Sequence, residues 1–468
     1  MTRLYTFFIF LLVAINIFAQ PIWHCNPTLA ELQQVGLPVL NIVTNNHEEP
    51  TYTPVDPPVG AFGRSIQAKK VNGNMTIVQH GDTLYHSGEY IKDSMGVTIK
   101  VRGNTSAYAD IKPYKIKLHK KADLLFRGND EQFQDKNWLL IDGNNLNTVI
   151  GYKLSEIIGM QWTPQYQFVN VVLNGQYRGL YMLLESVRRN PRCRITVDKQ
   201  TGYIIELDAY WWNEDLYFLS DYGRYYTFKY PDYEDVTENQ LNYITGAIND
   251  MEKTISESGK YENIIDIHSC VRWMLAHDIL GSSDAGGSNI YLAKEDDTDH
   301  SKFFMPVLWD FNAIASTPNQ WSAIHTSKFS FMSLFFRNTN FAFVEEYIQV
   351  WNMLSDSLFQ EMDDFLYNFA SSELFQQLEV SRQLVMRLLN YTDCTWYDDV
   401  LYFRDWFSMR QPWLQKSIKE LDVAVSVESP FSREEHHNYP QYDVSGKNIS
   451  AESVRGIRIS NVRKIFVF

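Results

Sequence analysis

The stretch from His277 to Leu292 combines residue types that could carry out phosphoryl transfer. A predicted helix ends, a loop rich in glycine and serine carries Asp284, and Asn289 opens a strand five positions later. A carboxylate beside an attacking hydroxyl can orient it and take its proton, and an amide oxygen can help to hold Mg²⁺. The alternative interpretation of these residues is an Asx-turn that starts a strand.

A second acidic position follows an apolar strand. Residues 304–308 are apolar, and the strand ends in Trp309, Asp310, Phe311 and Asn312. A hard oxygen ligand at the tip of a rigid strand suits Mg²⁺ that bridges the β- and γ-phosphates, whereas a capping Asp is the structural alternative. Protein kinases order and space a catalytic Asp, an Asn and a second Asp in this way. The sequence therefore predicts one catalytic residue and two metal ligands, which are Asp284, Asn289 and Asp310.

A small-residue loop and a lysine-bearing strand precede these acidic residues. The loop at residues 102–106 could wrap phosphates, and the next strand places two lysines on one face. A kinase-type site needs one such lysine and a carboxylate that orients it. Alternating lysines are also typical of the solvated face of an edge strand. The predicted nucleotide- and phosphate-binding residues are Arg102, Asn104, Ser106, Lys115, Lys117, Glu156 and Glu185.

The elements that must position these residues change period along the chain. The period is mostly two up to about residue 197, which predicts a sheet, with one helix at residues 146–158 laid on it. The period then becomes 3.6, which predicts helices at 238–256, 264–280, 343–369, 371–389 and 398–419. We therefore expect an α+β fold in which a β-rich lobe (about 37–200) and a mainly helical lobe (about 201–424) enclose a cleft.

The first 20 residues have the pattern of a secretory signal peptide. Arg3 flanks an apolar run at residues 7–18 that is short for a membrane span, and the small residue Ala19 follows. An uncleaved anchor is the alternative. No later stretch of the sequence looks able to span a bilayer, so we expect a soluble protein exported to the periplasm, the cell surface or the medium. Export permits disulfides, although free thiols suit the spacing equally well, among Cys25, Cys193, Cys270 and Cys394.

Composition limits the class of partner. The chain has 468 residues, is 45% hydrophobic and carries a formal charge of -14, so it can bury a large core and is poorly suited to nucleic acid. A hydrolase could be proposed from the acidic pairs at residues 363–364 and 398–399. Adjacent residues on a helix point apart, however, so neither pair would flank one bond. The oligomeric state stays open.

Six ordered blocks resemble the CotH kinase family, named for a bacterial spore-coat protein. The blocks are Arg102–Ser106, Lys112–Leu118, Asp135–Leu140, Asn174–Glu185, Asp284 with Asn289, and Pro306–Asn312. The similarity covers roughly residues 37–421. It implies a two-lobed, atypical protein-kinase-like domain at 37–424 that transfers the γ-phosphate of ATP to Ser or Thr of secreted or surface proteins, using Mg²⁺ or Mn²⁺.

The resemblance also implies roles for single residues. Asp284 matches the catalytic-loop aspartate and Asp310 the metal-binding aspartate, while Arg102 lies in the loop that would face the nucleotide. Two departures stand out. Residues 147–151 read Asn-Thr-Val-Ile-Gly where the family commonly has an Arg-Asn pair, and Asn312 replaces an acidic residue of many members. A non-catalytic pseudokinase or an adhesin-like surface protein is the alternative function.

The last segment, at residues 436–468, is predicted to be a separate strand-rich tail. It resembles the short C-terminal sorting segment of proteins that the type IX system of Bacteroidetes exports. An ordinary terminal hairpin is the alternative.

Overall fold

The computed structural model describes residues 26–128, 130–391, 395–428, 441–442 and 459–460. The predicted signal peptide lies outside the described residues, as does most of the predicted tail, of which β16 (Gln441–Tyr442) and β17 (Ile459–Ser460) form an antiparallel pair. Cys193 and Cys270 are free thiols, and the other two cysteines lie outside the described residues. No helix in the described part of the chain has the length and apolar character needed to cross a membrane.

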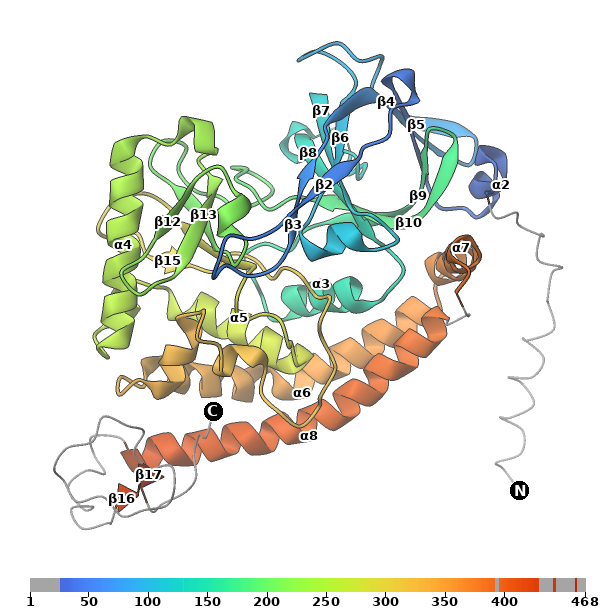
Figure 1. Ribbon diagram of the computed structural model, residues 1–468. Helices are drawn as coiled ribbons and strands as arrows, with labels where there is room; N and C mark the ends of the chain where they lie inside the picture. The colour runs from blue at the N-terminus through green and yellow to red at the C-terminus, as the bar shows by residue number, and fades with distance from the viewer. Residues whose placement is uncertain (1–25, 129, 392–394, 429–440, 443–458, 461–468) are drawn as a thin grey trace, which may run out of the picture.

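The first sheet closes into a barrel of seven strands, which lies in the upper right of Figure 1. Its order is β1-β9-β10-β8-β7-β6-β4, and β1 (Val39–Thr44) closes it by pairing with β9 in parallel and with β4 antiparallel. β5 (Asp82–His86) extends the sheet beside β4. The remaining barrel strands are β4 (Val71–Gln79), β6 (Val97–Val101), β7 (Tyr114–Ala122), β8 (Asp135–Asp142), β9 (Tyr166–Leu173) and β10 (Gln176–Glu185).

Period-two sequences build this barrel. In β7, Tyr114, Ile116 and Leu118 are buried, and the intervening Lys115 and Lys117 lie on the other face of the strand. β9 and β10 are buried along most of their length because α7 (Glu373–Leu389) packs on β10. Small elements complete this half of the molecule: α2 (Leu29–Gln34) and the hairpin of β2 (Tyr52–Val55) and β3 (Ser65–Ala68).

A second, antiparallel sheet carries the strand that follows the Asp284 loop. Its order is β12-β13-β11-β14-β15, and α4 (Glu238–Ser256) runs beside it in Figure 1. The strands are β11 (Tyr203–Leu207), β12 (Tyr217–Leu219), β13 (Tyr225–Tyr230), β14 (Ile290–Lys294) and β15 (Phe303–Phe304).

Helices underlie both sheets in Figure 1. α5 (Ile267–Leu280) packs against α6 (Ala342–Ala370), which in turn packs along α8 (Trp396–Glu428). α3 (Asn147–Ile157) lies between the barrel and this helical layer. Gly281 ends α5 in the left-handed conformation (φ 58°), which glycine adopts at little cost. The Asp284 loop therefore starts from a fixed point at the end of a buried helix.

The expected two-lobed kinase-like fold, with a cleft between a β-rich and a helical lobe, is wrong. The first half forms a closed seven-stranded barrel, and the region after it combines a five-stranded sheet with the helices. Alternating residues predict strands, but they do not show whether the two outer strands of a sheet meet. The pairing of β1 on both sides is what closes the barrel.

Candidate functional site

Asn289 and Asp310, which are 21 residues apart in the sequence, lie side by side. Nδ2 of Asn289 donates to Oδ2 of Asp310 over 3.2 Å. Both residues have positive φ, 61° and 63°. Such backbone conformations cost energy outside glycine and are found preferentially at functional sites. The backbone N–H of Asn312 donates to the other Asp310 oxygen over 3.2 Å, which holds the carboxylate in place.

Asp284 faces the same place from the loop between α5 and β14. It lines a small pocket together with Asn289 and Asp310. Partial burial, and after it the nearby Asp310 carboxylate, raises the pKa of Asp284. In the described part of the chain its carboxylate has no hydrogen bond or ion pair, so both oxygens remain available to a ligand.

Two acidic residues, Glu206 on β11 and Asp208 directly after this strand, hydrogen-bond the loop. Glu206 Oε1 accepts the backbone N–H of Asn289 at 3.1 Å, and Asp208 Oδ1 accepts the hydroxyl of Ser288 at 3.0 Å. Lys229 on β13 lies 2.9 Å from Glu206 Oε2. Burial raises the pKa of Glu206 to about 7 although Lys229 opposes the shift. Glu206 and Asp208 alternate at a strand end in the sequence, whereas Lys229 is a single cation in an aromatic strand and carries no signal.

Lys115 is an ammonium group without an anionic partner in the described structure. Burial, and after it the charge of nearby cations, lowers its pKa to about 8. These cations are Lys100, Arg188, Arg102 and Lys229. A desolvated charge surrounded by like charges is unfavourable unless an anion joins it. The group therefore has the properties of a phosphate site.

Arg102 connects this basic cluster to the carboxylates. It is close enough to Lys115 to lower the pKa of that lysine. It also acts on Tyr291, whose pKa burial raises well above its ordinary value, with Asp310 adding to the increase and Arg102 opposing it. The guanidinium thus lies within electrostatic reach of both Lys115 and the surroundings of Asp310.

The small-residue loop at residues 102–106 is held by contacts within the loop and with neighbouring segments. Asn104 Oδ1 accepts the hydroxyl of Ser65 at 2.5 Å. Gly103 has φ 89°, and a Cβ there would lie 2.1 Å from Oγ of Ser106, so only glycine fits. Tyr210 hydrogen-bonds Thr105 of this loop and lies near the carboxylates of Asp284, Asp208 and Asp310, which raise its pKa in addition to burial. Tyr210, which the sequence did not single out, links the loop to the acidic residues.

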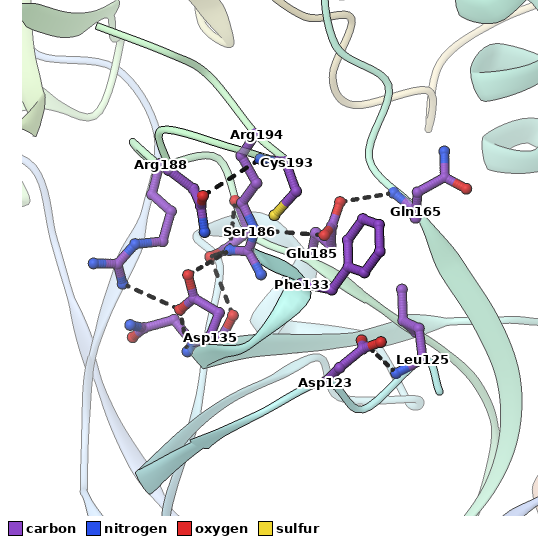
Figure 2. A network of polar contacts seen from close by, with 12 residues as sticks. Asp123, Leu125, Phe133, Asp135, Gln165, Glu185, Ser186, Arg188, Cys193 and Arg194 are labelled. Carbon is purple, nitrogen blue, oxygen red and sulfur yellow. Dashed lines mark hydrogen bonds and ion pairs between the residues drawn. The ribbon is translucent and has the colours of Figure 1, made fainter. Parts of the chain in front are cut away.

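Glu185 takes part in a different arrangement, shown in Figure 2. Its carboxylate is buried, 2.9 Å from Nη1 of Arg127 and 3.6 Å from Nε of Arg194, and it accepts the backbone N–H of Gln165 at 3.1 Å. Arg194 continues the network to Asp135 at 3.6 Å. Two arginines occupy this carboxylate, and no contact joins it to Lys115.

Glu156 and Lys117 are also not brought to the cluster. Glu156 is half exposed on α3 and pairs with Lys153 at 3.6 Å. Lys117 is exposed and lies near His119, whose pKa it helps to lower after burial. The contribution of α3 is different: Nδ2 of Asn147 donates to the backbone carbonyl of Phe311 over 3.1 Å, directly after Asp310.

The acidic pairs that suggested a hydrolase are engaged elsewhere. Asp363 pairs with Arg404 at 2.7 Å and Asp399 with Arg382 at 2.6 Å. Asp398 accepts the backbone N–H of Thr395 and caps the start of α8. These contacts are those of helix faces and caps.

The oxygen donors fit a divalent cation that is bound together with phosphate. Among the residues that the structure describes, no three His, Cys, Asp or Glu side chains form a metal cage of their own. Mg²⁺ rarely uses such cages, because it keeps several waters and is held by one or two carboxylates plus phosphate oxygens. Asp310 and Asn289, with Asp284 beside them, supply donors of this hard type.

Comparison with known proteins supports the resemblance seen in the sequence. No curated protein matches the chain. A family model described as CotH kinase protein matches residues 99–414, which is more than half of the chain and includes all the predicted site residues from Arg102 to Asp310. The chain therefore belongs to the CotH kinase family.

Proposed function

We propose that this protein is an exported protein kinase that transfers the γ-phosphate of ATP to Ser or Thr of secreted or surface proteins with the help of Mg²⁺ or Mn²⁺. The observation that carries the proposal is the partly buried ammonium of Lys115, which has no anionic partner among the described residues and which Arg102 connects to the Asp284, Asn289 and Asp310 group. A nucleotide phosphate chain would supply the negative charge that Lys115 and Arg102 lack. Its cation would supply the positive charge that the group of Asp284, Asn289 and Asp310 lacks.

Each residue then has a role in the transfer. Lys115 and Arg102 neutralise phosphate oxygens, and Asp310 and Asn289 hold the cation, which offsets charge on the β- and γ-phosphates when bound. Asp284 orients the acceptor hydroxyl. The hydroxyl oxygen forms a bond to the γ-phosphorus, the bond between that phosphorus and the bridging oxygen breaks, ADP leaves, and the proton passes to Asp284. The raised pKa of Asp284 favours this acceptance.

Transfer of radiolabelled γ-phosphate to co-secreted proteins, or to the protein itself, tests the proposal. Asp284→Asn and Asp310→Asn are each expected to lower transfer at least about 100-fold, because they remove the proton acceptor or a cation ligand. Asp364→Asn changes an exposed carboxylate on α6 and is the matched control. A folded Asp284→Asn, Asp310→Asn double variant with wild-type transfer would refute the proposal.

Binding measurements separate the kinase from a pseudokinase. Wild-type protein that binds ATP with Mg²⁺ in a thermal-shift assay, but transfers no phosphate to any acceptor, would be non-catalytic. Lys115→Met and Lys117→Met distinguish the two candidate lysines, since only Lys115 lies in the basic cluster. Lys121→Met, an exposed position on β7, is their control.

A further inference from the structure

Two buried nitrogen atoms on one face of α5 have no hydrogen-bond partner in the described structure. They are Nε1 of Trp273 and Nε2 of His277, and both side chains are 1% exposed. The residues are four apart on the helix, and their ring centroids are 4.2 Å apart. Buried polar atoms are nearly always paired, because an unpaired one keeps the cost of its lost hydration. A partner that belongs to neither residue is therefore expected.

Both side chains line the pocket that Asp284 also lines. The cavity volume is about 10 Å³, which is close to the lower limit for one water molecule. The carboxylate of Asp284 lacks a partner among the described residues as well. Three polar groups without partners thus surround a space that accommodates a single small molecule.

The other nitrogen of His277 indicates which proton the ring carries. Nδ1 lies 2.9 Å from Oγ of Ser282. If Nδ1–H donates to this hydroxyl, Nε2 is an acceptor. Burial lowers the pKa of His277 to about 4, so the ring is neutral at pH 7. One water molecule could then accept the Trp273 N–H and donate to Nε2 and to Asp284, which gives three bonds, the typical number for a buried water.

We propose that this pocket holds one ordered water molecule that joins Trp273, His277 and Asp284, and that His277 is a positioning residue for Asp284. The water would hold one carboxylate oxygen and leave the other directed at the acceptor hydroxyl. The water site rests on the geometry alone. The positioning role rests on the proposed function.

A high-resolution structure and ¹⁵N spectra of the full chain test the water site without any assay of activity. We expect density for one water within hydrogen-bond distance of the three groups and a protonated Nδ1 in His277. An empty pocket, or a His277 ring protonated at Nε2, would overturn the proposed geometry. This result is independent of whether the protein transfers phosphate.

Paired substitutions test the positioning role. His277→Asn keeps a polar atom near the Nδ1 position, which faces Ser282, and loses the one at Nε2, whereas His277→Gln does the reverse. We expect His277→Asn and Trp273→Phe to lower kcat about 5- to 10-fold, the effect of one neutral hydrogen bond, with KM for ATP unchanged. His277→Gln should retain most activity.

Trp162→Phe is the matched control, since it removes another buried indole N–H that has no partner among the described residues and lies outside the pocket. Full activity in His277→Asn together with loss of activity in His277→Gln would contradict the positioning role. It would show that His277 only holds Ser282. If both His277 variants are unfolded by circular dichroism, Trp273→Phe decides, because it keeps the ring in place. Wild-type protein without any transfer would refute the proposed function and leave the water site to the structural test.

Discussion

Gly151 on α3 lies against the ring of Phe311, the residue that follows Asp310. A Cβ at position 151 would be 2.3 Å from Cδ1 of Phe311, much closer than packed atoms approach. Asn147, one turn earlier on α3, donates to the carbonyl of the same phenylalanine. Helix α3 therefore fixes the backbone that presents Asp310, although the resemblance suggested a different residue pair for this helix.

Gly151→Ala is expected to destabilise the protein by about 1–3 kcal/mol, because the added methyl forces Phe311 to move. Phosphate transfer should fall as well, since Asp310 moves with its neighbour. Gly246→Ala is the matched control: it lies in α4 with no atom within 4 Å of the new methyl, and it should stabilise the helix by about 0.5–1 kcal/mol. Denaturant unfolding measures the stability of both variants. Equal free energies of unfolding in the two variants would show that α3 can move away from Phe311 at no cost.

The sequence predicted single elements better than their assembly. α4 begins and ends where the 3.6 period predicted, and β6 lies in the part of the chain where the period of two predicted strands. The closure of the barrel was missed, because it depends on the pairing of β1 with strands far away in the chain. Local periodicity contains no information about such partners.

The same distinction applies to the site. Asp284, Asn289 and Asp310 were grouped by their spacing along one short stretch, and the structure places Asn289 beside Asp310. Glu185 was predicted to bind nucleotide, and only the fold shows that Arg127 and Arg194 contact its carboxylate. Partners supplied by distant segments decide whether a buried acid is structural or available to a ligand.

Lys115→Met should stabilise the free protein at pH 7, because it removes a partly buried charge that has no counterion in the part of the chain that the structure describes. The pKa of Lys115 is lowered from 10.5 to about 8 in the folded state, so between these values the unfolded chain binds more protons. Wild-type stability relative to the variant should therefore rise with pH from about 8 to 10.5. Denaturant unfolding across this range measures it. A wild-type protein more stable than Lys115→Met at pH 7 would indicate a partner for the ammonium.

The charge of Lys115, which destabilises the free protein, should strengthen the binding of nucleotide. Its charged form attracts phosphate, so the affinity for ATP is expected to fall as pH rises above about 8. Lys115→Met should bind about 10- to 100-fold more weakly at pH 7, the range for a hydrogen bond to a charged group, and without this dependence. Calorimetric titration at several pH values tests this. The same decline in both proteins would exclude Lys115 as its source.

Glu206 should make the stability of the folded protein depend on pH between about 4.5 and 7. Burial raises its pKa from 4.5 to about 7, so within this window the folded chain holds a proton that the unfolded chain has released. The stabilisation is complete below pH 4.5 and is lost as pH rises through 7, by roughly 3 kcal/mol. Glu206→Gln cannot titrate and should remove this slope while its amide oxygen still accepts the N–H of Asn289.

Lys229→Met should extend the slope to higher pH, because it removes the cation that opposes the rise in the pKa of Glu206. Glu361→Gln, at an exposed position on α6, is the control for both, and a slope that Glu206→Gln leaves unchanged would assign the titration to another group.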